Sequence, residues 1–365
     1  MPYRGAISLD PSASRESILR VLSYAGIFWL ALQYGSDSRR ARYALRALAA
    51  GSACYALYGL GVAFLGLERT LWFEKTVYHD AVTATFVNPN SFATYAGIGL
   101  LCATAVLRYR FERGAPGAVG LRLRLNYLFA EFMPRNALFL AMWLVLAGAL
   151  LLSLSRAGAA ATALSLLVFF WVLALGRGVR LRKIVLSSIG PALAGAALFL
   201  LIGEGLERRV LDTGADWQRR SEIYAQTLSA IEESPLLGTG LGTFGPVYRS
   251  HRSEEIRPGV NMAHNDYLEL ALELGIPAAV LFVFSIMVLA LGCALGVRGR
   301  GRRDAVLPAV GIAACTLVGA HALVDFSLQI PAVAATFALV LGVSVAQARP
   351  VGGARAAGPH PLRRA

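Results

Sequence analysis

The sequence contains nine apolar stretches that are each about as long as a membrane-spanning helix. Such a helix needs about 20 mostly apolar residues, because the hydrocarbon core of a bilayer is about 30 Å thick. The stretches cover residues 17–34, 43–67, 90–107, 136–154, 157–175, 184–203, 275–296, 306–324 and 331–348. The sequence therefore predicts an all-α integral membrane protein with about nine transmembrane helices.

The overall composition agrees with this class. Hydrophobic residues make up 56% of the 365 residues and charged residues only 16%, whereas soluble domains average about 45–50% apolar and about 25% charged residues. This difference excludes an ordinary cytosolic enzyme and a disordered chain. The four cysteines lie inside apolar stretches without a short metal-like spacing, so they predict neither a disulfide framework nor a zinc site.

Arginine-rich segments separate several of the apolar stretches and alternate along the chain. They are residues 35–46, 108–135, 176–183, 297–304 and the tail from residue 349. These segments hold 22 of the 35 Lys and Arg residues and only four acidic residues, so their net charge of +18 exceeds the +13 of the whole chain. Because Lys and Arg accumulate in cytoplasmic loops, we expect these segments inside. The positive charge then needs no nucleic acid partner.

This topology places the amino terminus outside, although residues 1–16 contain no signal peptide. We expect that the sequence begins inside a longer protein whose earlier spans are missing; the alternative is that the first helix inserts unaided. Six transmembrane helices are then expected within residues 1–203 and three within 275–348, with a disordered cytoplasmic tail at 349–365.

Residues 204–274 form a long extracytoplasmic segment in this topology. The segment has nine acidic residues between Glu204 and Glu255, seven arginines and two histidines, and this content favours a functional loop over a linker. Apolar residues at helical spacing within 217–232 predict a helix on the membrane surface. A glycine-rich turn follows, and a second helix begins near residue 264 and leads into the next span.

Arginines near the predicted outer face are the first candidates for a binding site. Arg156 lies between two long apolar runs, and an arginine at that depth normally pairs with another group. Its guanidinium could bind two phosphate oxygens, or it could extend to lipid headgroups. Arg219 and Arg220 begin the predicted surface helix. Alone they are typical of a solvated face, but together with Arg156 they could clamp a pyrophosphate.

Two histidines lie beside polar residues. His264 precedes Asn265 and Asp266, which are helix-capping residue types, so it could bond the backbone or act as the base for a sugar hydroxyl. His321 and Asp325 are four residues apart, a spacing that places them on one helical face. They could satisfy one another, support a site, relay a proton or hold a metal, although two groups alone are weak evidence for a metal.

Two further motifs are less specific. Asn88 and Asn90 flank a proline before an apolar stretch, which is a helix-start signal, and their amides could also bind sugar. The run GTGLGTFG at 238–245 is similar to a glycine-rich phosphate loop but lacks a preceding strand and a following Lys-Ser/Thr, so no nucleotide is indicated. Its backbone amides could instead line a polar cleft.

In combination, these motifs resemble the O-antigen ligase / O-antigen polymerase family of bacterial polysaccharide enzymes. The resemblance covers about residues 80–345 and rests on FVNPNSFATY at 86–95, SRAG at 155–158, RRSEIYAQTL at 219–228, SPLLGTGLGTF at 234–244, AHNDYLELALELGIP at 263–277 and HALVD at 321–325. Each motif is loose alone, whereas their order on these predicted sides of the membrane is specific.

The resemblance implies an inverting glycosyltransferase of the bacterial inner membrane whose active site faces the periplasm. Members take a glycan from an undecaprenyl-pyrophosphate carrier without a metal or nucleotide sugar, so no cofactor is expected. The family's two membrane-edge arginines correspond to Arg156 and Arg220, and its loop histidine corresponds to His264. Tyr224 stands where members often have tryptophan. Members have about twelve spans, so about three amino-terminal spans are expected to be missing.

The implied mechanism needs arginines that neutralise the leaving pyrophosphate and a base, His264, that accepts the proton of the acceptor hydroxyl. Glu222 and Asp266 are near enough in sequence to orient these groups. The acceptor stays open: a lipid A–core sugar for a ligase, a growing glycan for a polymerase, or a protein for an oligosaccharyltransferase. A transporter of lipid-linked glycan is the alternative from another class, but the polar residues gather at one face, which favours an enzyme.

Overall fold

A computed structural model describes residues 8–114, 120–190, 206–251, 260–298 and 300–349, and this part of the chain is almost entirely helical. One small antiparallel hairpin pairs β1 (Arg69–Thr70) with β2 (Phe73–Glu74). The helices are α1 (Pro11–Tyr34), α2 (Ser38–Phe64), α3 (Pro89–Gly114), α4 (Leu121–Asn126), α5 (Met133–Arg135), α6 (Ala137–Leu152), α7 (Arg156–Gly176), α9 (Leu206–Glu233), α10 (Phe244–His251), α11 (Asp266–Leu274), α12 (Ile276–Arg298), α13 (Val306–His321) and α14 (Pro331–Ala348), with a π-helical turn at Tyr127–Phe132, a 3-10 turn at Ser327–Gln329, and further helix at 181–190. The prediction of an all-α protein is confirmed.

Among the described residues, five helices are long and apolar enough to cross a membrane: α2, α3, α7, α12 and α14. A sixth span results if residues 122–135 and α6, which meet at an angle of 85°, are counted as one. The apolar helix α13 has only 16 residues. Most of the predicted span 184–203 and of the predicted tail lies outside the described residues. The total of nine spans therefore stays a prediction.

Helix α3 lies at the centre of the bundle, with 83% of its apolar window buried. Small residues allow this close packing, because helices in a membrane associate mainly through close packing of their surfaces. A methyl group at Gly99 would lie 2.3 Å from the Ser52 side chain of α2, and one at Gly97 would lie 2.3 Å from the Thr162 hydroxyl of α7. In contrast, only 11% of the apolar window of α12 is buried, as expected of a helix that faces lipid.

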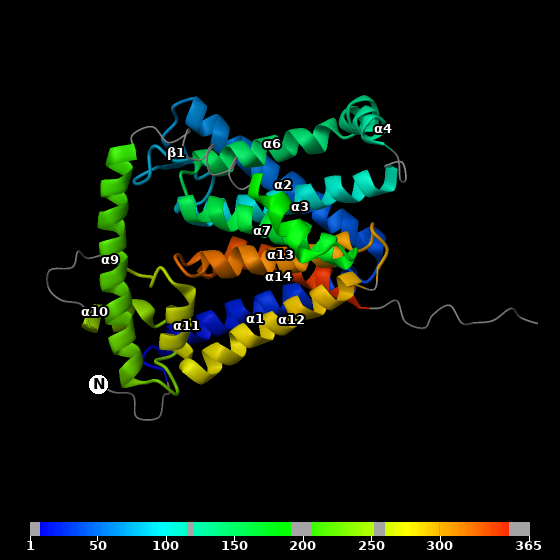
Figure 1. Cartoon of the computed structure of the whole chain (residues 1–365). Coiled ribbons are helices and arrows are strands. Elements are labelled where there is room, and N and C mark those ends of the chain that lie inside the picture. Colours follow the sequence, from blue (N-terminus) through cyan, green and yellow to red (C-terminus); the bar gives the residue numbers. More distant parts are fainter. Residues whose placement is uncertain (1–7, 115–119, 191–205, 252–259, 299, 350–365) are drawn as a thin grey trace, which may run out of the picture.

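The two ends of the bundle differ in composition. Figure 1 shows the long helices running alongside one another, with α9 lying across their ends beside α10 and α11, and α4 at the opposite end. Arginine-rich segments meet at that opposite end: Arg177 pairs with Glu112 at the end of α3, and the Arg303 guanidinium lies 5.7 Å from the centre of the Tyr109 ring. We call these the α9 end and the arginine-rich end. Which end faces the cytoplasm stays a prediction.

Candidate functional site

The three residues that follow α13, 322–324, link the bundle to the α9 end of the molecule through hydrogen bonds to their backbone carbonyls. The carbonyl oxygen of Ala322 accepts a hydrogen bond from the N–H of Asp266 at 2.9 Å, and that of Leu323 accepts one from Asn265 Nδ2 at 3.0 Å. The next carbonyl, of Val324, accepts from the Arg220 guanidinium. Since carbonyl groups at a helix end have no intrahelical partner, donors from α9 and α11 satisfy them here. Asn265 also caps α11 through the N–H groups of Tyr267 and Leu268.

His264 lies between these anchors, and four features restrain it. Its backbone has a φ of +52°, a left-handed conformation that is uncommon outside glycine and that tends to occur at functional sites. Its carbonyl oxygen accepts from the Tyr224 hydroxyl at 2.8 Å. Its ring packs edge-on against the Phe326 ring, with 4.9 Å between the two ring centres. Its Nδ1 lies 3.2 Å from Asp325 Oδ1. The imidazole is therefore held in one orientation.

The contact with Asp325 determines which ring nitrogen of His264 carries the proton. The Asp325 side chain is 1% exposed, and because a carboxylate oxygen accepts hydrogen bonds, we assign Nδ1–H of His264 as the donor. Nε2 then keeps its lone pair. Because the His264 side chain is 28% exposed, Nε2 can meet an incoming hydroxyl. This arrangement is that of a general base oriented by a carboxylate.

His321 and Asp325 have different partners, so the expectation that they satisfy one another is wrong. Helix α13 ends at His321, and the N–H of Asp325 bonds the His321 carbonyl at 3.1 Å, but the two side chains have different hydrogen-bond partners. His321 is buried, and its Nδ1 contacts the hydroxyls of Thr94 at 3.1 Å and Ser327 at 3.0 Å. Asp325 instead pairs with His264, which is 61 residues away in the sequence.

Hydrogen bonds continue from His321 to the start of α7, where Arg156 lies. The Thr94 hydroxyl donates to the carbonyl of Asn90 at 3.0 Å, and Asn90 Oδ1 accepts from the Ser155 hydroxyl at 2.7 Å. Ser155 caps α7 through the N–H of Gly158, and exposed Arg156 is the first residue of that helix. Asn88 Oδ1 accepts from the N–H of Asn90 at 2.8 Å, in agreement with the helix-start signal. Both asparagine oxygens are therefore used within the protein.

Helix α9 brings Arg220 and Tyr224 to the same place, one helical turn apart. Arg220 is half-buried and bonds the Tyr224 hydroxyl as well as the Val324 carbonyl. Burial raises the pKa of Tyr224, so its hydroxyl stays protonated near neutral pH. Arg219 is exposed next to Arg220. Most of the predicted site residues are thus connected by hydrogen bonds. Arg156 follows Ser155 in the sequence and Arg219 precedes Arg220, and both of these neighbours belong to the hydrogen-bonded network.

Three buried carboxyl groups on α11 were not singled out together by the sequence analysis. Asp266, Glu269 and Glu273 are each less than 5% exposed. Burial raises the pKa of Asp266 to about 8, and the charge of Asp325 acts in the same direction, whereas the hydrogen bond from the Leu328 N–H acts against it. Burial also raises the pKa of Glu269, whose Oε2 accepts from the Ala263 N–H at 2.8 Å. Their three- and four-residue spacing marks one helical face, a signal that was present in the sequence.

The glycine-rich run 238–245 serves to pack α10 and α1 against α11. Glu273 Oε1 accepts from the N–H of Phe244 at 3.1 Å, and its carboxylate also bonds the N–H groups of Gly242 and Thr243. The N–H of Thr239 donates to Leu272 O, and the Ser14 hydroxyl of α1 donates to Leu241 O at 2.8 Å. These amides are occupied within the protein, so the expectation that they line a polar cleft is not supported for them.

Comparison with protein families gives a match in the middle of the chain. Residues 140–283 match the model of a family described as O-Antigen ligase. No curated protein matches the chain. The matched residues include Arg156, Arg220, Tyr224 and His264, and the resemblance predicted from the motifs is confirmed. The chain has several helices long and apolar enough to cross a membrane and carries an O-antigen ligase family domain at residues 140–283, which supports O-antigen ligase or polymerase-type glycosyl transfer in general.

Proposed function

We propose that the chain transfers a glycan from an undecaprenyl-pyrophosphate carrier to an acceptor hydroxyl, at the periplasmic face of the bacterial inner membrane and with inversion at the anomeric carbon. The contact between His264 Nδ1 and Asp325 Oδ1 at 3.2 Å, next to Arg220, is the observation that supports this reaction most strongly. This arrangement places a base, His264, and a cation, Arg220, within one hydrogen-bonded group of residues.

In the proposed step, the acceptor oxygen attacks the anomeric carbon while the bond from that carbon to the pyrophosphate oxygen breaks. The hydroxyl proton passes to Nε2 of His264, and the charge of Asp325 stabilises the imidazolium that forms. Pyrophosphate leaves with its electron pair as an anion. A general acid is not required if arginines neutralise the developing charge, because pyrophosphate is already a good leaving group.

Arg220 and Arg156 are proposed to bind the pyrophosphate, with Arg219 as a further contact. A guanidinium has five N–H donors, so Arg220 can bond the Val324 carbonyl and Tyr224 and still bind phosphate oxygens. Arg156 is the first residue of α7, and the amino end of a helix also attracts anions through its dipole and N–H groups. In this proposal, Arg156 and Arg220 meet the phosphates from two different helices.

The family match supports glycosyl transfer over the transporter alternative, but it does not choose the acceptor. We propose a lipid A–core sugar, with a growing glycan or a protein hydroxyl as the alternatives. Deletion of the gene distinguishes them through the surface polysaccharide of the cell. Loss of all chains attached to the core indicates a ligase, single repeats on the core indicate a polymerase, and an intact surface polysaccharide with loss of protein-linked glycan indicates transfer to protein.

Replacement of His264 tests the proposed base. We expect His264→Ala to remain folded and to lose about two to four orders of magnitude in turnover with a lipid-linked donor in proteoliposomes, which is the usual contribution of general base catalysis. The matched control is His251→Ala. Within the described part of the chain, His251 bonds the Val247 carbonyl of α10, Ser250 and Glu233 of α9 and none of the proposed site residues, so transfer should continue.

A His264→Ala variant that transfers glycan at close to the normal rate contradicts the proposal. A second variant, Asp325→Asn, tests the orientation of the ring. The amide can present its N–H₂ group to Nδ1, which favours the tautomer with the proton on Nε2. We therefore expect a large loss of turnover with little change in donor binding.

A further inference from the structure

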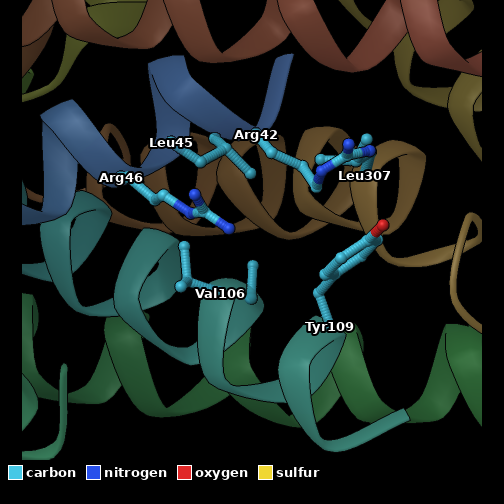
Figure 2. Close-up of a pocket in the computed structure, with 7 residues that line it drawn as sticks. Arg42, Leu45, Arg46, Val106, Tyr109 and Leu307 are labelled. Atoms are coloured by element: carbon cyan, nitrogen blue, oxygen red, sulfur yellow. The ribbon is translucent and has the colours of Figure 1, made fainter. Parts of the chain in front are cut away.

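A partly open pocket lies at the arginine-rich end, far along the bundle from the proposed active site. It is formed between α2, α3 and α13, and we call it the α2–α3–α13 pocket. Figure 2 shows Arg42 and Arg46 extending from α2 toward α3, where Val106 and Tyr109 lie. The floor of the pocket is apolar, because it is lined by the buried side chains of Leu45, Val106 and Leu307. The pocket thus combines two guanidinium groups with an apolar floor.

Neither arginine of this pocket forms a salt bridge with a carboxylate among the described residues, although the charge of Asp37 lies close enough to act on Arg42. The Arg42 guanidinium lies 4.9 Å from the centre of the Tyr109 ring. The Arg46 guanidinium lies 5.6 Å from the centre of the Tyr43 ring, and its buried Nε makes no hydrogen bond within the described part of the chain. Arg110 of α3 is close enough to Arg46 for their positive charges to repel one another.

The acidic residues of this end are engaged elsewhere. Asp37 accepts from the backbone N–H groups of Arg39 and Arg40 at the start of α2. Glu112 pairs with Arg108 and Arg177, and Asp304 lies 3.7 Å from Arg303. The partly buried charge of Arg46, which repels Arg110 and is paired with no carboxylate among the described residues, costs free energy that a bound anion would offset.

The position of the pocket indicates the source of such an anion. Arg42 and Arg46 lie at the start of the apolar stretch 43–67, and Tyr109 lies just after the end of the stretch 90–107. In the predicted membrane topology, both boundaries fall where lipid headgroups meet the hydrocarbon core. A soluble phosphate would be held by the arginines alone, whereas a phospholipid headgroup would also be held at this depth by its acyl chains in the bilayer.

We propose that Arg42 and Arg46, which line the α2–α3–α13 pocket, bind the phosphate group of an anionic phospholipid at the opening of this pocket, because its volume of about 10 Å³ admits only a water-sized group. Guanidinium groups bind phosphate through two parallel hydrogen bonds, and basic pockets between transmembrane helices are typical sites for anionic headgroups. The site differs from the proposed pyrophosphate site in its helices and lies at the opposite end of the bundle. Its role is to neutralise this end of the bundle and to fix α2 against α3.

The test uses the purified full chain in a neutral detergent, and it follows the thermal unfolding midpoint as lipid is added. We expect phosphatidylglycerol to raise the midpoint and phosphatidylcholine to have little effect. In Arg42→Gln/Arg46→Gln, the concentration of phosphatidylglycerol needed for half of the shift should rise at least tenfold. Native mass spectrometry of the same samples should show phosphatidylglycerol retained by the wild type and lost from the variant.

Arg39→Gln/Arg40→Gln is the matched control, because it removes the same charge from the same helix at two exposed positions outside the pocket. It should keep the response to phosphatidylglycerol. The proposal is overturned if both pairs lose the response equally, if neither pair loses it, or if the wild type does not distinguish the two lipids. An equal shift with inorganic phosphate, abolished by Arg42→Gln/Arg46→Gln, would overturn the lipid and identify a soluble phosphate as the ligand.

Discussion

The stability of the protein should fall as pH rises through neutrality because of Asp266. Burial, with the Asp325 charge acting in the same direction, raises the pKa of Asp266 from 3.8 to about 8. Between these values the folded chain retains a proton that the unfolded chain releases. The stabilising effect is therefore complete below about pH 4 and is lost as the pH rises through about 8.

The size of the effect follows from the difference between the two pKa values. A difference of about 4 pH units corresponds to roughly 6 kcal/mol at most, since each unit is worth about 1.4 kcal/mol. About half of this, roughly 3 kcal/mol, should be lost between pH 6 and pH 9. Asp266→Asn keeps an oxygen for the Leu328 N–H but cannot ionise, so it should remove most of this loss.

The assay is unfolding of the purified chain in detergent at several pH values between 6 and 9. Burial also raises the pKa values of Glu269 and Glu273, so Asp266→Asn should retain a smaller decline. Asp304→Asn serves as the control, because Asp304 is 43% exposed at the arginine-rich end and should leave the slope unchanged. An equal slope in the wild type and Asp266→Asn, or a wild type that gains stability with rising pH, would refute the reasoning.

Three further changes test other parts of the structure. Arg156→Lys and Arg220→Lys keep the charge but lose the two-pronged geometry, so transfer in proteoliposomes should fall about ten- to a thousandfold; near-normal rates in both would favour contact with lipid headgroups instead. Gly275→Ala should destabilise the chain by about 2–4 kcal/mol in detergent unfolding, because Gly275 has a φ of +78° and its added methyl would lie 2.3 Å from a backbone oxygen. Finally, a cysteine at exposed Ser229 should react with a membrane-impermeant thiol reagent in cells with a permeabilised outer membrane, and one at exposed Arg124 should not; the reverse pattern would overturn the topology.

The helices of the bundle could be predicted closely from hydropathy. The predicted stretches 157–175 and 331–348 match α7 and α14 to within one residue at each end, because Ser155 caps the first and Pro331 begins the second. Hydropathy did not predict the 85° bend before α6, nor the first half of α9. That half holds only four large apolar residues, Leu206, Val210, Leu211 and Trp217, among charged ones, so a search for apolar stretches did not detect it.

The candidate site could be predicted as a set of residues but not as a set of contacts. His264, Arg220 and Asp325 were all identified from local motifs. Local spacing nevertheless paired Asp325 with His321, and that pairing requires a helix that continues through residue 325. Because α13 ends at His321, Asp325 turns toward His264, and only the tertiary fold brings these two residues together.

The backbone carbonyls of Ala322, Leu323 and Val324 have a consequence for how this region can evolve. They bind Asp266, Asn265 and Arg220 regardless of which side chains the three residues carry. We therefore expect the residue at position 323 to vary among functional relatives, because Leu323 is 55% exposed and only its carbonyl is needed. An inserted or deleted residue is different, because it would shift all three carbonyls and Asp325 relative to their partners at once. We expect this short turn to vary in composition while its length stays fixed.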